Sequence, residues 1–199
     1  MRESDSVAEQ VMEEFCHLDK GLSSMSPNPV QSAVCECYLG IDPGLNRTGY
    51  AVLRRGPKGP VLCEGGVIRS TKEKTLAERV HEIGEGLREV CAEYNPQVMA
   101  IEQIFSTVQF PKTAILMAHA RGAILYAAAE HKLEVVHYAA KQIKRLLTGS
   151  GKASKEQMQD AVQRELRLKQ RPEPNDVADA CAVALCHYHH IRLPTAIGA

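Results

Sequence analysis

A chain of 199 residues with 44% hydrophobic and 24% charged residues has the size and composition of one globular domain. No apolar run approaches the ~18–20 residues that cross a bilayer, so we expect no membrane segment. The seven cysteines are odd in number and irregularly spaced, which excludes a disulfide-stapled secreted module and favours the reducing cytoplasm.

Basic and acidic residues balance at 24 each, but they are unevenly distributed along the chain. Residues 1–37 contain seven acids and two bases, whereas residues 141–171 contain nine bases and three acids. Such a basic stretch is typical of a polyanion-binding surface, although a solvated helix face would look the same. We predict an acidic N-terminal extension over 1–36 (a helix and then a linker), a folded domain over 37–191 and a C-terminal tail over 192–199.

Three strands open the predicted domain. Residues 37–41 form a short apolar strand, and Asp42-Pro43-Gly44 after it is a strong turn signal. Residues 48–53 and 60–69 are predicted as the next two strands, joined by a loop over 54–59 that contains Gly and Pro. Consecutive strands with short connections indicate an antiparallel meander.

Helices and strands then alternate. Apolar residues at spacings of three and four predict an amphipathic helix over 74–94, which Asn95-Pro96 ends. The remaining predicted elements are a buried strand over 98–101 ending at Glu102, an Ala-rich helix over 112–131 buried on the sheet, a strand over 133–138, a basic helix over 140–147, a helix from the N-cap Ser154 to about residue 168, and a last helix over 175–190. This order indicates an α/β fold with a five-stranded mixed sheet and helices on both faces.

Four carboxylates stand where solvated surface charge is not expected. Asp42 and Glu102 each end a predicted strand, and Asp176 and Asp179 share a face at the start of the last helix. Each alone has an ordinary explanation as a turn former, a strand-end charge or an acid favoured by the helix dipole. If the two strands are neighbours, however, all four acids meet at the carboxyl edge of the sheet, where open α/β sheets bind ligands.

A cluster of that kind repels itself unless cations neutralise it. Its ligands would all be oxygens, which favours Mg²⁺ or Mn²⁺ over zinc. Two such ions about 3.5–4 Å apart are the arrangement that hydrolyses phosphodiesters. The four acids together therefore predict a metal-dependent phosphodiesterase.

Five stretches of the chain resemble, in order and spacing, the motifs of one protein family. They are 38–50 (Tyr-Leu-Gly-Ile-Asp-Pro-Gly-Leu-Asn-Arg-Thr-Gly-Tyr), 100–105 (Ala-Ile-Glu-Gln-Ile-Phe), 118–122 (Ala-His-Ala-Arg-Gly), 138–144 (Tyr-Ala-Ala-Lys-Gln-Ile-Lys) and 176–180 (Asp-Val-Ala-Asp-Ala). Together they resemble the RuvC family of bacterial Holliday junction resolvases over about residues 37–190. Each motif alone is weak, but their combination in register is highly specific.

The resemblance implies a ribonuclease-H-like fold and a homodimeric endonuclease. Enzymes of this family cut four-way DNA junctions by paired nicks on strands of like polarity, and they leave 5′-phosphate and 3′-hydroxyl ends. The match of motifs makes Asp42, Glu102, Asp176 and Asp179 the catalytic and metal-binding acids, and it makes Lys144 and Lys155 the lysines that assist at the scissile phosphate. It also implies two Mg²⁺ ions per active site, with Mn²⁺ able to substitute.

The resemblance extends to partners. Phe105 matches a family aromatic that contacts bases near the junction centre, and the chain has only three Phe and no Trp. Arg47, Lys141 and Lys152 are further predicted DNA contacts. Because a junction is two-fold symmetric, a two-fold dimer is expected, with the helix containing Arg121 as one candidate interface. The RuvA–RuvB branch-migration complex is the implied protein partner.

Three other interpretations stay open at this point. Residues 39–44 also resemble the phosphate loop of sugar kinases and actin, although those phosphotransferases need two such domains. A nuclease of the same fold could act on RNA, and a non-catalytic protein could bind junctions without cutting them.

Two further motifs are incomplete. Residues 149–152 lack the full P-loop pattern, and the Cys and His residues at 35–37 and 186–190 lack a full set of zinc-spaced ligands.

Overall fold

A central sheet organises the computed structural model, which describes residues 36–104 and 111–191. The strands are β1 (Cys37–Asp42), β2 (Arg47–Gly56), β3 (Gly59–Arg69), β4 (Val98–Glu102) and β5 (Glu134–Tyr138). They lie in the order β3-β2-β1-β4-β5, with antiparallel pairing among β1, β2 and β3 and parallel pairing of β4 with both β1 and β5. The predicted five-stranded mixed sheet is confirmed, and β1 and β4, the two strands that end in acids, are neighbours.

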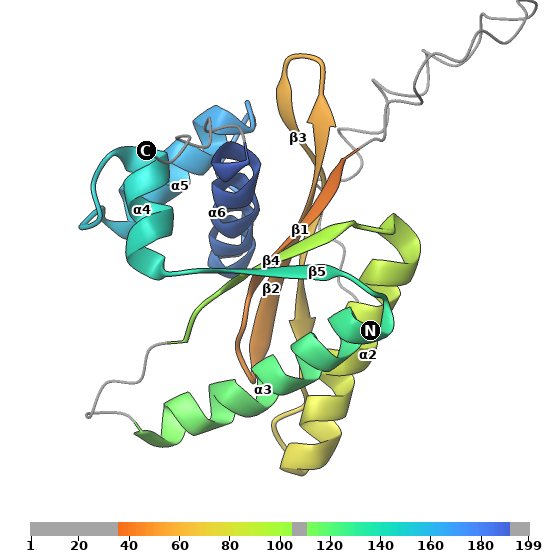
Figure 1. Cartoon of the computed structure of the whole chain (residues 1–199). Helices are drawn as coiled ribbons and strands as arrows, with labels where there is room; N and C mark the ends of the chain where they lie inside the picture. The colour runs from red at the N-terminus through yellow and green to blue at the C-terminus, as the bar shows by residue number, and fades with distance from the viewer. Residues whose placement is uncertain (1–35, 105–110, 192–199) are drawn as a thin grey trace, which may run out of the picture.

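Helices cover both faces of the sheet, as predicted (Figure 1). They are α2 (Leu76–Tyr94), α3 (Pro111–Glu130), α4 (Ala140–Thr148), α5 (Lys155–Glu165) and α6 (Asn175–His190). α2 and α3 share a core with Leu39, Ile41 and Ile101, whereas α4, α5 and α6 share a core with Ala100 and Tyr138. Alternate residues of a strand face opposite sides, so β2 and β4 contribute to both cores. Among the helices described, none is long and apolar enough to span a bilayer.

Local sequence signals set the ends of the helices. Thr75 and Glu78 form a capping box at the start of α2, and Asn95 ends that helix in the left-handed conformation. The capping box predicted for Ser154 and Gln157 is present at the start of α5. β2 and β3 run further than predicted and meet in a tight hairpin, because the turn uses only the residues between Gly56 and Gly59. The predicted extension and tail, 1–36 and 192–199, lie outside the described residues except for Glu36.

The predicted burial of α3 is only half right. Ala120 and Ile124 are fully buried, but Ile115, Leu116 and Tyr126 are 58%, 41% and 61% exposed. The Ala-rich sequence is apolar around most of the helix, whereas the sheet and α2 cover only one side of it. We call the exposed residues Ile115, Leu116, Gly122 and Tyr126 the α3 strip.

Two glycines bring α6 into close contact with the sheet. A Cβ added at Gly40 of β1 would lie 2.3 Å from the carbonyl oxygen of Ala180, and one added at Gly49 of β2 would lie 2.1 Å from that of Asp176. Only a residue without a Cβ permits such an approach. The first turns of α6 therefore lie directly on β1 and β2.

Candidate active site

Two of the predicted acids end neighbouring strands. In the parallel pairing of β1 with β4, Ile41 lies opposite Ile101, so Asp42 and Glu102 follow side by side. The two isoleucines belong to the core under α2 and α3. Strand alternation therefore directs Asp42 and Glu102 to the other face, which α6 covers.

The other two acids come from the start of α6. Asp176 and Asp179 lie three residues apart and so share one side of the helix. The contact between Gly49 and the backbone of Asp176 places this end of α6 beside the end of β1. Asp42 is close enough to Asp179, Glu102 and Asp176 for each of their charges to raise its pKa. The four acids predicted from three distant stretches of sequence are thus brought together.

The cluster resists full ionisation. Burial raises the pKa of Asp42 to about 7, and the charges of Asp179, Glu102 and Asp176 contribute to the rise. Burial and the charge of Asp179 also raise the pKa of Glu102. The pKa of Asp179 is raised by burial and by Asp176, although Lys155 opposes the rise. Carboxylates that desolvation and mutual repulsion both disfavour are typical of a functional site rather than of a structural ion pair.

Basic side chains border the acids. The Nζ atom of Lys155, at the start of α5, is 3.8 Å from Oδ2 of Asp179. The charge of Lys144 on α4 partly opposes the rise in the pKa of Asp179, so this second lysine also lies near the cluster. Arg47, the first residue of β2, holds Oδ2 of Asp176 at 2.7 Å from its Nη2. Both predicted catalytic lysines and one predicted DNA contact therefore lie at the site.

The other predicted DNA contacts include two lysines of α4 and the loop that follows it. Lys141 on α4 and Lys152 in the loop after α4 are both exposed. Gly149 in that loop is in the left-handed conformation and caps the end of α4. Phe105 lies outside the described residues, and its contact with DNA bases stays a prediction.

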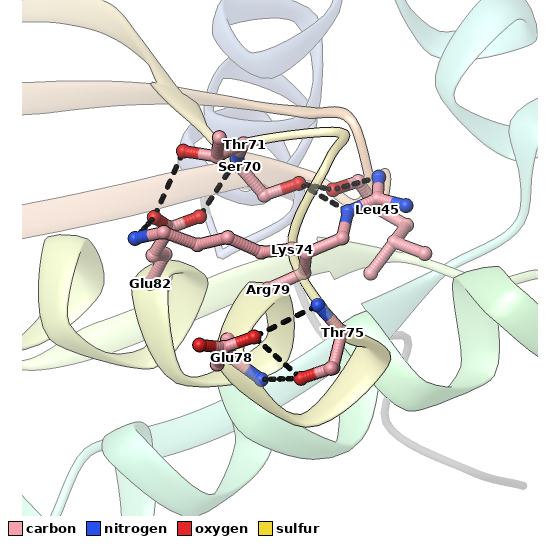
Figure 2. A network of polar contacts seen from close by, with 8 residues as sticks. All are labelled: Leu45, Ser70, Thr71, Lys74, Thr75, Glu78, Arg79 and Glu82. Carbon is pink, nitrogen blue, oxygen red and sulfur yellow. Dashed lines mark hydrogen bonds and ion pairs between the residues drawn. The ribbon is translucent and has the colours of Figure 1, made fainter.

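A polar network that the sequence analysis did not identify holds the turn after Asp42 (Figure 2). Arg79 on α2 donates through Nε to Oγ of Ser70 (3.1 Å) and through Nη2 to the carbonyl oxygen of Leu45 (3.5 Å) and to Oδ1 of Asn46. Ser70 itself donates to the same Leu45 oxygen. The signal available in the sequence was the spacing of Arg79, which lies three residues after Leu76 and four before Ile83 and so on the apolar side of the predicted helix, where an arginine needs acceptors nearby. The network ties the turn between β1 and β2 to α2.

The donor set of the acidic cluster fits a hard divalent cation. All four groups are carboxylates, the ligand type that Mg²⁺ and Mn²⁺ prefer. Within residues 36–104 and 111–191, no group of three or more Asp, Glu, His or Cys side chains is placed so that it could hold a metal ion by itself. Mg²⁺ does not require such a group, since it keeps several waters and binds through one or two carboxylates plus substrate phosphates. The four carboxylates therefore fit divalent ions whose remaining ligands are waters and a phosphate of the substrate.

The Cys and His residues at the end of α6 have a structural explanation. Cys37 and Cys186 are buried, and burial raises the pKa of Cys186 to about 12. Nδ1 of His187 lies 2.9 Å from the hydroxyl oxygen of Tyr138, and its ring packs edge-on against Tyr38. Cys186 and Tyr138 belong to the core between α6 and the sheet, whereas Cys37 belongs to the core under α2 and α3.

The fold and the site define a class of protein. A mixed sheet in the order β3-β2-β1-β4-β5, with carboxylates at the ends of β1 and β4 and on a helix packed across them, is the arrangement of a ribonuclease-H-like nuclease. The family model described as "Crossover junction endodeoxyribonuclease RuvC" matches residues 38–187. The chain belongs to the RuvC family. Membership of this nuclease family implies dependence on a divalent metal.

Individual relatives agree with this assignment. The crossover junction endodeoxyribonuclease RuvC of Rhodopirellula baltica is 54% identical over 155 residues, which cover 76% of this chain and 86% of the relative. That of Nitrosomonas eutropha is 44% identical over 152 residues, covering 76% and 83%. The solved structure of Thermus thermophilus RuvC in complex with Holliday junction substrate matches with a TM-score of 0.75 at 34% identity, over 80% of this chain and 97% of that one.

Proposed function

We propose that this chain is a structure-specific endonuclease that resolves Holliday junctions, in DNA recombination and repair, by divalent-metal-dependent hydrolysis of phosphodiesters. The observation that carries the proposal is the meeting of four carboxylates at the carboxyl edge of the sheet, where the pKa of Asp42 is raised to about 7. Membership of the RuvC family supports the activity. The relative whose structure holds a Holliday junction supports the substrate.

The four acids are the proposed metal ligands. Asp42, Glu102, Asp176 and Asp179 would hold two Mg²⁺ ions, which Mn²⁺ could replace. Such ions, when bound, would make water a nucleophile at neutral pH and would stabilise the leaving oxygen. The family resemblance implies that the P–O3′ bond breaks, so that each nick would leave a 5′-phosphate and a 3′-hydroxyl. The contribution of the chain is to fix these oxygens on two strand ends and one helix, which are rigid elements.

The neighbouring lysines act on the phosphate. Lys155 is 51% exposed although it pairs with Asp179, so its ammonium group is open to an incoming phosphate oxygen. Lys144 is half-buried beside the acids. A positive charge at each position would stabilise the charge that develops on the phosphate oxygens in the transition state. We therefore assign both lysines to the catalytic site.

Binding of the junction involves a wider surface. The guanidinium group of Arg47 is oriented by Asp176 and is suited to a backbone phosphate at the entrance to the site. Lys141 and Lys152 extend the positive surface along α4 and the following loop. Phe105 is proposed to stack on bases at the junction centre.

A homodimer would use the α3 strip. Ile115 and Tyr126 are more than half exposed, and a Cβ added at Gly122 between them would meet no atom within 4 Å. Glycine inside a helix costs roughly 0.5–1 kcal/mol relative to alanine, and nothing in the described protomer requires it there. A second α3 approaching closely would require it and would also cover the apolar side chains. Two copies related by a two-fold axis would present one active site to each of two symmetric strands.

Substitution in the strip tests the dimer. Tyr126→Glu is expected to produce monomers in sedimentation velocity and to replace paired nicks by single ones, because a charge would be buried at the contact. Leu76→Glu is the matched control, since Leu76 is also exposed but lies at the start of α2. A Tyr126→Glu variant that sediments as a dimer would contradict this assignment of the interface.

The cellular setting follows from the same proposal. Cys91 and Cys181 are buried free thiols, which is compatible with the reducing cytoplasm of a bacterium. We propose RuvA–RuvB, the branch-migration complex, as the protein partner there.

A synthetic four-way junction tests the proposed function directly. Each strand is labelled in turn, and cleavage is followed with Mg²⁺, with Mn²⁺ and with EDTA. We expect paired nicks on two strands of like polarity with either metal, ends that a ligase can rejoin, and no cutting in EDTA. Faster cleavage of a structured RNA would instead favour a ribonuclease, and tight ATP binding without cleavage would favour a phosphotransferase.

A further inference from the structure

Arg121 on α3 ends in hydrogen bonds to two different strands. Its Nη1 donates to the backbone carbonyl oxygen of Glu102 at 2.6 Å, and its Nη2 lies 2.6 Å from Nδ1 of His137. Arginine can only donate, so Nδ1 of His137 must be the acceptor. Glu102 is the last residue of β4, and His137 is the next to last of β5. One guanidinium group thus bridges the ends of both strands.

The ladder of the sheet explains why this carbonyl needs a donor from outside. The amide of Gln103 donates to the carbonyl of Tyr138 at 2.9 Å, so odd-numbered residues of β4 point their backbone groups toward β5 and even-numbered ones point toward β1. With Ile41 opposite Ile101, the ladder partner of the Glu102 carbonyl would be the N–H of residue 43. Residue 43 is proline, which has no N–H.

Arg121 supplies the missing donor from the opposite face of the sheet. Its neighbours Ala120 and Ile124 are buried in the core between α3 and the sheet. The carboxylate of Glu102 faces α6 on the other side, as the strand alternation requires. The guanidinium group therefore fixes the backbone of Glu102 without competing for its carboxylate oxygens.

We propose that Arg121 is a positioning residue that replaces the hydrogen bond Pro43 cannot make and so fixes Glu102 in the acidic cluster. The importance of Glu102 for cleavage rests on the proposed function. The hydrogen bond from Arg121 to the end of β4 is independent of that function. The assignment also gives α3 two distinct sides, with the α3 strip on one and the support of Glu102 on the other. Loss of a group that orients a metal ligand typically costs 10–100-fold in metal affinity or activity.

Hydrogen exchange of the protein without DNA or metal is the first test. In Arg121→Met, we expect faster exchange of the amides of β4 near Glu102, including Gln103, because the strand end has lost its anchor. In Arg121→Lys, these amides should exchange at rates between those of the wild type and of Arg121→Met, since a lysine ammonium group reaches only one of the two acceptors. Arg55→Met is the matched control: its Nε pairs with Glu36 at 2.6 Å at the opposite end of β1. Unchanged exchange in Arg121→Met would overturn the proposal.

Cleavage of the four-way junction is the second test. For Arg121→Met we expect a single-turnover rate about 10–100-fold lower and a higher Mg²⁺ concentration for half-maximal rate. The Kd for the junction in EDTA should change less than about twofold, and the oligomeric state should not change. Arg121→Lys should recover part of the rate, and Arg55→Met should keep the wild-type rate. Equal losses in Arg121→Met and Arg55→Met, or a monomeric Arg121→Met, would overturn the positioning role.

Two outcomes separate this inference from the proposed function. If the wild-type chain cuts no junction, the proposed function fails, but the exchange experiment still decides whether Arg121 anchors β4. If Arg121→Met does not fold, Arg121→Lys decides, and wild-type exchange together with wild-type cleavage in that variant would overturn the proposal.

Discussion

Carboxylates occur in two contrasting environments in this molecule. At the start of α2, the exposed Glu78 and the half-buried Glu82 accept hydrogen bonds from Thr71, Lys74 and Thr75 (Figure 2). Hydrogen bonds from Lys74 and from the backbone of Thr71 lower the pKa of Glu82 to about 2. At the carboxyl edge of the sheet, by contrast, burial and neighbouring acids raise the pKa of Asp42 to about 7.

The comparison separates structural charge from functional charge. A carboxylate whose partners are complete in the folded chain stabilises that chain and needs no ligand. A carboxylate whose ionised form is disfavoured in the folded chain can gain only from something that binds, and a divalent cation is the strongest such group. The two regions should therefore respond in opposite ways to neutral substitutions, to pH and to Mg²⁺.

Neutralising the centre of the acidic cluster should have the largest effect. We expect Asp42→Asn to lower the single-turnover rate of junction cleavage by roughly 10³-fold or more, since a lost metal ligand removes several kcal/mol of transition-state stabilisation. Binding of the junction in EDTA should be retained or become tighter, because a negative charge facing the phosphates is gone. The rate is measured on labelled junctions and the Kd by gel shift. Cleavage at the wild-type rate would show that Asp42 is not a ligand.

The same substitution should stabilise the metal-free protein. The pKa of Asp42 is about 7 in the folded chain against 3.8 as its ordinary value, so ionisation disfavours the folded state increasingly between these values and fully above pH 7. Asp42→Asn should therefore raise the free energy of unfolding at pH 8 in EDTA by about 1–4 kcal/mol, and the gain should vanish near pH 4. Urea unfolding at both pH values measures it.

Mg²⁺ provides the control for that experiment. At about ten times its Kd, the ion should stabilise the wild-type chain by about 1.4 kcal/mol at pH 8 and should stabilise Asp42→Asn much less. A variant less stable than wild type at pH 8 without metal would show that ionised Asp42 does not destabilise the folded chain.

The fold was predictable because each of its elements has a local signal. The spacing of Val80, Ile83 and Leu87 predicts α2, and the three-residue step between Asp176 and Asp179 predicts that both face one way. The boundaries of β2 and β3 were less predictable, because the last residues of a hairpin are held by their partner strand and not by their own pattern. The exposed side of α3 was not predictable at all, since its apolar sequence is the same whether a sheet or a second protein covers it.

The acids of the candidate site were predictable, but their support was not. Asp42 and Glu102 could be placed together because parallel neighbours end at the same edge of a sheet. Arg79 and Arg121 are far from these acids in sequence, and their roles depend on which backbone carbonyls the fold leaves without donors. Pro43 was interpreted as a turn former, although its missing N–H also determines which side chain must reach Glu102.

Removal of one lysine from the edge of the cluster should have an intermediate effect. Lys155→Met is expected to lower the cleavage rate about 10–100-fold, because one charge-stabilising group is lost while the four acids remain. Because Lys155 lowers the pKa of both Asp42 and Asp179, its loss should also increase the proton uptake of the metal-free site near neutral pH. Single-turnover rates at saturating Mg²⁺ measure the first effect. An unchanged rate would place Lys155 outside the reaction.

The smallest effect is expected at the start of α2, where the comparison began. Glu82→Gln should lower the Tm slightly at pH 7, because the folded pKa of about 2 lies below the ordinary value of 4.5 and the ionised form therefore stabilises the folded chain. That contribution is present above pH 4.5 and is lost as the pH falls toward 2, so the difference in Tm between variant and wild type should shrink with acidification. It should also shrink in high salt, since the contacts of Glu82 with Thr71 and Lys74 are exposed. Neither the cleavage rate nor the Mg²⁺-induced stabilisation should change in this variant, and a change in either would mean that the two groups of carboxylates are not independent.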